Sequence, residues 1–235
     1  MDEFWRAMGS AGTMITTFDA DLWEIIGLSL RVSLAATVIA AVIGLPLGAA
    51  IALGRFPGRR VLIVGFHALM GLPPVVVGLV VYLLLSRAGP FGVLNLLFTP
   101  TAMIIAQVIL VLPIIVSLTR EILETLWQEY HEALRSLAAS SVQSLVILLW
   151  DGRTMLVTAL LAGFGRAVAE VGAVMIVGGN IDHVTRVMTT SITLEASKGN
   201  LSIALGLGLV LLLLSLTINM AVYGFKHMAA VRHPA

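Results

Sequence analysis

The chain has 235 residues, of which 59% are hydrophobic and 11% are charged, and its mean hydropathy is +1.02. Soluble domains carry about a quarter charged residues, so this composition excludes an ordinary water-soluble domain and indicates a polytopic membrane protein in contact with membrane lipid. The formal net charge of +1 gives no reason to expect nucleic acid as a partner, and the lack of cysteine excludes disulfides and thiolate metal sites.

The predicted elements begin with residues 1–24, which are mixed and acidic and lack the basic and apolar regions of a cleaved signal peptide. We expect them to form an extracytoplasmic or interfacial segment. Residues 25–228 are predicted to be the transmembrane domain, and 229–235 a cytoplasmic tail. Five apolar stretches can each cross about 30 Å of hydrocarbon as a helix. They are residues 32–53, 61–86, 101–118, 154–177 and 201–225. The sequence therefore predicts an all-α membrane protein with five transmembrane helices.

Prolines interrupt several of these stretches. Pro73 and Pro74 break the second, whereas Pro46 and Pro113 kink the first and third. Interrupted membrane helices often line substrate sites, but the same residues also form static kinks, and the sequence leaves both interpretations open.

Basic residues indicate the orientation of the chain. If the N-terminus is outside, eight arginines and lysines lie on the cytoplasmic side and five on the opposite side. Arg55, Arg59 and Arg60 form a tight cluster within the first group. We therefore expect the loop at 120–153 and the C-terminus to be cytoplasmic.

The loop at 120–153 is a long polar segment in an otherwise apolar chain. From Glu121 to Leu137 apolar residues recur every three or four positions, and polar residues form a second stripe at the same period. This pattern predicts an amphipathic helix. Ser141 is a predicted cap for a second short helix that runs toward Trp150. A helix pair at the membrane surface suits a docking element, and it equally suits a plain interfacial link between two spans.

Part of this loop resembles a known motif. Glu132-Ala133-Leu134, followed by Ala138 and a mainly apolar run, resembles the EAA loop of ABC-importer permeases. In that family the pattern has a second Ala where this chain has Leu134, Gly where it has Ala138, and a terminal Pro where it has Asp151. The resemblance implies that this loop couples the permease to an ATPase. The coupling residues would be Glu129, Glu132, Ala133, Arg135 and Ala138.

The fourth apolar stretch contains Arg166 and Glu170. Ionised side chains are costly in a membrane, and at positions i and i+4 the two can pair on one face of a helix. Such a pair either joins the helices of the bundle or lines a polar route for an anion, and the sequence does not decide between these roles.

The same region carries a more specific resemblance. Gly165-Arg166-Ala167, Glu170-Val171-Gly172-Ala173 and Gly178-Gly179-Asn180 are similar to the signature of the molybdate, sulfate and tungstate branch of ABC permeases. The following runs at 185–190 and 194–199 most closely resemble tungstate-type permeases. The resemblance covers about residues 25–225.

This resemblance implies a prokaryotic inner-membrane permease with the type I ABC-importer fold and a cytoplasmic coupling helix. It implies a homodimer, two cytoplasmic ATPase subunits that hold ATP and Mg, and an extracytoplasmic binding protein that delivers tungstate. The chain itself would bind no cofactor and would not be an enzyme. It has no glycine-rich phosphate loop of its own.

A group of hydrogen-bond donors follows the fourth stretch: Asn180, Thr185, Arg186, Thr189, Thr190, Ser191 and Thr193. A tetrahedral oxyanion needs such donors, although an ordinary external loop has a similar composition. The predicted translocation path or gate is Arg166, Glu170, Asn180, Thr189, Thr190 and Ser191.

Other functions remain as alternatives. Molybdate or sulfate could replace tungstate as the cargo, because all three are tetrahedral oxyanions. An ion-driven secondary transporter fits less well, since five spans divide poorly into two inverted halves. We find no catalytic constellation, and among the five histidines only His227 and His233 have close spacing, so we predict no metal site.

Overall fold

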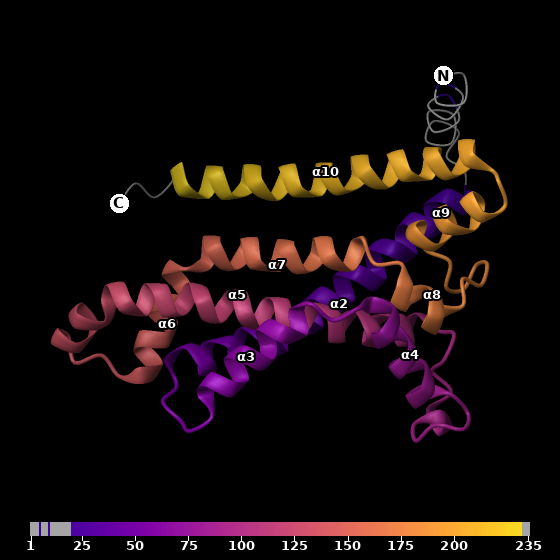
Figure 1. Cartoon of the computed structure of the whole chain (residues 1–235). Helices are drawn as coiled ribbons and strands as arrows, with labels where there is room; N and C mark the ends of the chain where they lie inside the picture. The colour runs from indigo at the N-terminus through magenta and orange to yellow at the C-terminus, as the bar shows by residue number, and fades with distance from the viewer. Residues whose placement is uncertain (1–4, 6–8, 10–19, 232–235) are drawn as a thin grey trace. The chain divides into compact units, whose positions relative to one another are not determined.

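The computed structural model describes residues 20–231 and the isolated positions 5 and 9, and every regular element within 20–231 is a helix (Figure 1). In chain order these are α2 (Ala20–Leu53), α3 (Arg59–Met70), α4 (Pro74–Leu85), the short 3-10 helix η1 (Gly92–Leu94), α5 (Pro100–Ser136), α6 (Ser141–Asp151), α7 (Arg153–Val168), α8 (Gly172–Gly178), α9 (Met188–Ser197) and α10 (Leu201–Val231). The all-α prediction is confirmed. Most of the predicted segment at 1–24 lies outside the described residues, as do positions 232–235 of the predicted tail, whereas 20–24 belong to α2.

Three helices are long and apolar enough to cross a membrane alone: Asp21–Leu53, Pro100–Ser136 and Leu201–Ala221. They contain the predicted spans at 32–53 and 101–118 and most of the one at 201–225. Two bent helix pairs raise the number to five if each pair is one span. These pairs are α3 with α4, bent by 101°, and α6 with α7, bent by 69°. The part of the chain that the structure describes therefore holds three to five membrane spans.

The second and fourth predicted spans are not continuous helices. In the second, α3 ends at Met70 and α4 begins at Pro74, as the proline pair predicts, because Pro lacks the N–H that a continuing helix needs. In the fourth, the expectation of one helix over 154–177 is wrong. There α7 ends at Val168 and α8 begins at Gly172.

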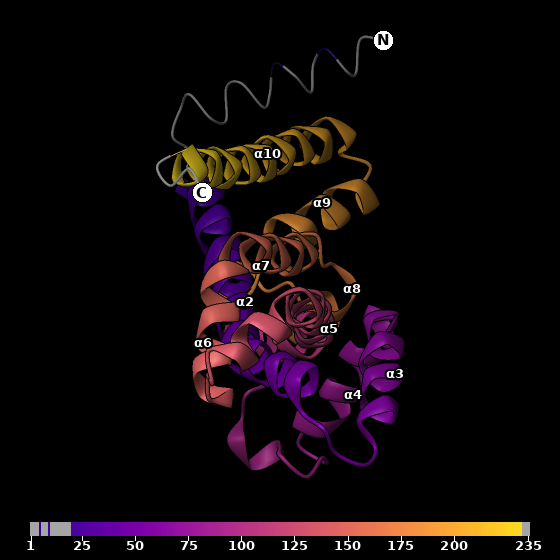
Figure 2. The same ribbon diagram turned by 90° about the vertical axis from the view of Figure 1, so that its left-hand side faces the viewer.

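The described chain packs as two compact units, and α2 and α5 contribute residues to both. The first unit comprises the described residues up to 33, then 74–106, and those from 168 onward. In it α4 packs against α8, and α9 packs against α10 (Figure 2). The first turns of α2 share an apolar core with α9 and α10. This core consists of Leu22, Ile26, Met188, Leu207 and Val210.

The second unit comprises residues 34–73 and 107–167. Its helices α5 and α7 run side by side (Figures 1 and 2), and Gly163 of α7 lies against Val111 of α5. The contact of α2 with α5 is equally close at Gly48, where a Cβ would lie 2.8 Å from the carbonyl oxygen of Val116. Small residues let membrane helices approach in this way, which explains the glycines within the apolar stretches.

Candidate functional site

The predicted docking element at 120–153 consists of the last turns of α5 and the whole of α6. The predicted amphipathic helix from Glu121 is confirmed to Ser136, and it continues the third span without a break. The second short helix is also confirmed, but its predicted cap is wrong. Ser140, and not Ser141, is the N-cap, because its Oγ accepts a hydrogen bond from the Gln143 backbone N–H at 3.3 Å. The Gln143 side chain accepts one from the Ser140 N–H at 2.8 Å, which completes a capping box.

The inner face of this element rests on a closely packed core. Leu123 of α5 and Leu148 of α6 are fully buried. They pack together with Leu126 and Leu134 of α5 and with two alanines near the end of α2. The core therefore fixes α6 to the rest of its unit, so a force applied to α6 reaches α5 and α2 through packed side chains.

The outer face presents both the predicted residues and an apolar surface that the sequence analysis did not assign. All five predicted coupling residues (Glu129, Glu132, Ala133, Arg135 and Ala138) are exposed. Beside them Leu137 is 76% exposed, Val142 71% and Trp150 71%. On α6 the helical period that buries Leu148 leaves Val142 and Trp150 on other faces, so the signal for these two was present in the sequence. Leu137 follows the apolar stripe of α5, but it is exposed because the helix ends at Ser136. Exposed apolar groups on a polar loop are typical of a protein interface.

The turn between α5 and α6 depends on Ala138. Its φ angle is +51°, in the left-handed region that glycine adopts readily and alanine rarely. Its N–H donates to the Arg135 carbonyl, and the Ala139 N–H donates to the Leu134 carbonyl, both at 3.0 Å. The position at which the ABC-permease motif has Gly thus keeps a glycine conformation here, although the residue is Ala.

A second feature missed at the sequence level is the ion-pair cluster beside this element. Arg59 donates to the carbonyls of Ile51 at 2.7 Å and Ala52 at 3.2 Å, near the end of α2. Its guanidinium also lies 3.1 Å from the Glu124 carboxylate, which pairs with Arg120 as well. In the sequence Arg59 indicated only the orientation of the chain. In the structure it joins the end of α2 to α5 and supplies donors to carbonyls that the helix end leaves unpaired.

The prediction that Arg166 and Glu170 share one helix face is wrong. Arg166 lies in the last turn of α7, whereas Glu170 lies beyond the end of that helix. Glu170 is 4% exposed, and its Oε1 accepts a hydrogen bond at 3.0 Å from the N–H of Ala173, in the first turn of α8. Its backbone carbonyl accepts another from the Thr189 hydroxyl at 2.9 Å. At the break between α7 and α8 this carboxylate thus satisfies one of the N–H groups that the start of α8 leaves unpaired.

The predicted donor group divides into occupied and unoccupied side chains. The Thr185 hydroxyl donates to the Gly178 carbonyl at 2.6 Å, and the Thr190 hydroxyl donates to the Val187 carbonyl at 3.0 Å. These two threonines, like Thr189, are buried and hold the segment between α8 and α9 in place. By contrast, Ser191 Oγ and Asn180 Oδ1 are buried and have no hydrogen-bond partner among the described residues. The Ser191 hydroxyl is therefore available to donate a hydrogen bond, whereas the unpaired Asn180 Oδ1 can only accept one.

These observations define the chain as a multi-pass, all-helical membrane protein with a packed polar loop. Residues 43–228 match the family described as binding-protein-dependent transport system inner membrane component. The chain therefore belongs to this family, and with its membrane-spanning helices it is a multi-pass permease of the inner membrane.

Individual relatives agree with this assignment. The chain is 42% identical over 217 residues to a tungstate uptake system permease protein of Peptoclostridium acidaminophilum, covering 92% of this chain and 95% of the relative. It is 44% identical over 189 residues to a probable anion ABC transporter permease protein of Haloferax volcanii, covering 78% of this chain and 82% of the relative. It is 29% identical over 189 residues to a sulfate transport system permease protein of Escherichia coli, covering 74% of this chain and 68% of the relative. The resemblance inferred from the sequence is confirmed.

Proposed function

We propose that this chain is the membrane subunit of an ABC importer that moves tungstate into the cytoplasm. The observation that carries the proposal is its similarity, over 92% of its length and at 42% identity, to a tungstate uptake permease. The sulfate permeases compared with it reach only 29–31% identity over 62–74% of the chain. Tungstate is therefore favoured over sulfate. Molybdate remains the second candidate because its size and charge are close to those of tungstate.

In this proposal the chain crosses the membrane five times with its N-terminus outside, and it works as a homodimer. A partner ATPase docks on the turn between α5 and α6. The exposed apolar side chains Leu137, Val142 and Trp150 support this assignment, since they lie on the same docking element as the exposed Glu129 and Glu132. The fully buried Leu148 beneath them keeps that surface rigid.

ATP binding would bring two ATPase subunits together and move the docking elements, residues 120–153, of the two permease chains. The permease would then open outward to a binding protein. Hydrolysis would then return it to the inward-facing state. The ATP and its Mg belong to the partner subunits. This chain contributes a rigid connection, in which Leu148, Leu123 and the Arg59–Glu124 pair join α6 to α5 and α2.

For the anion path we place Ser191 ahead of the other predicted residues, and Asn180 stays a predicted path residue without this support because its unpaired atom, Oδ1, is an acceptor. An oxyanion needs hydrogen-bond donors, and the Ser191 hydroxyl has no partner within the described chain. The hydroxyls of Thr189 and Thr190 already bond to backbone carbonyls, so their first role is to hold the start of α9. Arg166 and Glu170 remain proposed as charged groups of the path or its gate.

Two experiments test the proposal at separate points. Deletion of residues 129–150 should release the ATPase during co-purification from membranes, whereas retention of the ATPase would exclude this loop as the coupling surface. In vesicles that contain the whole importer, unlabelled tungstate should compete for labelled tungstate uptake better than molybdate, and sulfate should compete least. Equal competition by sulfate would contradict the tungstate assignment while leaving the permease assignment intact.

The path proposal has its own matched pair of variants. Ser191→Ala removes a hydroxyl that bonds to no described residue, so it should reduce uptake without lowering the melting temperature. Thr190→Val removes a hydrogen bond at the start of α9 and should lower both. Normal uptake by Ser191→Ala would remove Ser191 from the path.

A further inference from the structure

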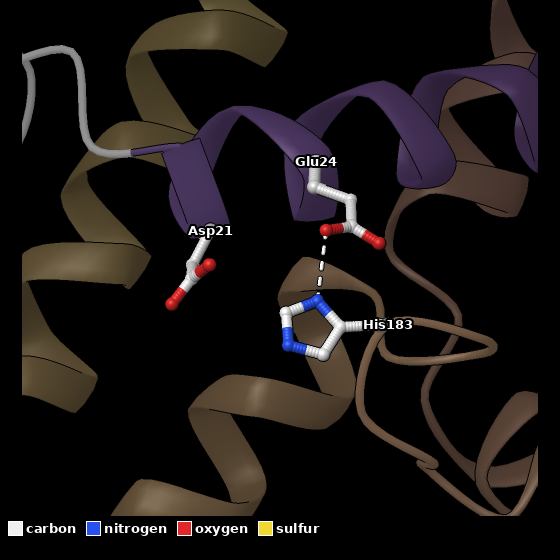
Figure 3. A group of neighbouring side chains, drawn as sticks. All are labelled: Asp21, Glu24 and His183. Carbon is white, nitrogen blue, oxygen red and sulfur yellow. Dashed lines mark hydrogen bonds and ion pairs between the residues drawn. The ribbon is translucent and has the colours of Figure 1, made fainter.

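The loop between α8 and α9 brings a histidine next to two carboxylates at the start of α2. Figure 3 shows Asp21 and Glu24 on the first turns of α2, with the Glu24 carboxylate hydrogen-bonded to the ring of His183 and the Asp21 side chain to one side of it. The Nδ1 atom of His183 lies 2.9 Å from Glu24 Oε2, although the two residues are 159 positions apart. One ligand atom from each of the three residues lies within 4.8 Å of the other two. All three are exposed and belong to the same compact unit.

We propose that Asp21, Glu24 and His183 form a binding site for a divalent transition-metal cation of the Zn²⁺ type. The imidazole distinguishes this group from an ordinary cluster of surface carboxylates. One nitrogen and two oxygens match the ligands that Zn²⁺ takes in proteins, whereas Ca²⁺ and Mg²⁺ prefer oxygen ligands alone. Three protein ligands also leave a position for water, which suits an exposed site.

The charges around the histidine favour a cation at this place. Asp21 and Glu24 bring two carboxylates to a single imidazole. The next acid in the chain, Asp182, is already paired with Arg186, at 2.6 Å. The Nδ1 atom of His183 lies within hydrogen-bond distance of the Glu24 carboxylate. The two carboxylates therefore bring negative charge to the ring, and this charge would stabilise a metal ion on a ring nitrogen.

Bound metal would tie the first turn of α2 to the loop at 179–187. This loop leads directly into α9, whose first N–H, on Met188, donates to Ser29 Oγ of α2 at 2.8 Å. A metal ion would add a second connection between α2 and this segment. Hydrogen exchange of the backbone amides at 181–186 should then slow when the ion binds. This inference does not depend on the identity of the transported anion.

This site could not be predicted from the sequence, because its residues are far apart in the chain. His183 has no second histidine at ligand spacing, and Asp21 and Glu24 look like the ordinary acidic start of a helix. Only the packing of the first turns of α2 beside the loop at 179–187 brings the three together.

The direct test is isothermal titration of the full chain with Zn²⁺, after purification without a polyhistidine tag. We expect saturable binding of one ion per chain, and a loss of affinity of at least about tenfold in both His183→Ala and Asp21→Asn. His131→Ala is the matched control, since it removes an imidazole that has no carboxylate pair in the described chain, and it should bind Zn²⁺ like the parent. Ca²⁺ should not compete.

A second variant keeps the proposal testable by spectroscopy. The chain has no cysteine, so His183→Cys introduces a single thiol. With Co²⁺ as the probe, this variant should show a thiolate-to-metal absorption band that disappears on addition of Zn²⁺. Absence of that band, absence of saturable Zn²⁺ binding to the parent, or unchanged Zn²⁺ affinity in His183→Ala would each overturn the proposal.

Discussion

Ala138→Gly should make the protein more stable, although glycine usually destabilises a folded chain. Ala138 has a φ of +51°, and the left-handed conformation costs an L-residue roughly 1–2 kcal/mol, a cost that glycine does not have. Glycine adds about 0.4–1 kcal/mol of conformational entropy to the unfolded state, which offsets part of this gain. We therefore expect a net increase in the free energy of unfolding of about 0.5–1 kcal/mol.

Ala133→Gly is the matched control for this prediction. Ala133 is exposed like Ala138 but lies inside α5, where glycine costs about 1 kcal/mol relative to alanine. Thermal unfolding of the detergent-solubilised protein should therefore give shifts of opposite sign for the two variants. Hydrogen exchange at 137–144 should slow in Ala138→Gly. If both variants lower the melting temperature, the left-handed turn at Ala138 does not exist as described.

Four further variants test other parts of the structure. Leu148→Ala leaves a cavity at a fully buried site beneath the docking element, so it should cost about 2–5 kcal/mol of stability and weaken ATPase retention. Ile147 is half-exposed, so Ile147→Ala should leave the stability nearly unchanged. Ser140→Ala should cost about 1 kcal/mol through loss of the capping box, while Ser141→Ala should be near neutral in denaturant unfolding; equal effects would contradict the cap assignment. Gly78→Ala places a Cβ 2.7 Å from the Ala173 Cα and should lower the melting temperature by separating α4 from α8, while Gly65→Ala, with open space around it, should not. His183 has a raised pKa in the fold, so its pair with Glu24 stabilises the protein fully below about pH 6.5 and less as the pH rises through the folded pKa; His183→Gln, measured with a chelator present, should remove that pH dependence.

Composition and periodicity were sufficient to predict most of the fold. Apolar length predicted the membrane helices because lipid requires every backbone group to be paired inside the span, and this requirement leaves few alternatives to a helix. The helical period of Leu123, Leu126 and Leu134 predicted the buried face of α5, and Pro73 predicted the break between α3 and α4. These signals are local, so the sequence alone could carry them.

The errors arose where contacts distant in sequence decide the local structure. The stretch around Glu170 is apolar enough to continue as a helix, but the Glu170 carboxylate accepts from an N–H in the first turn of α8, and its carbonyl bonds to Thr189, which is 19 residues away. Several of the predicted oxyanion donors are likewise used to hold the backbone, as the bonds of Thr185 and Thr190 show. The number of donor side chains can be read from the sequence, but the sequence does not show which of them already donate to backbone carbonyls.

The central claim is that this permease imports tungstate at the expense of ATP. The most direct measurement is accumulation of labelled tungstate in sealed vesicles that contain the permease, its ATPase and its binding protein, with ion gradients collapsed. The account predicts uptake that requires ATP and that stops when residues 129–150 are deleted. Uptake that proceeds without ATP and follows an imposed ion gradient would contradict it.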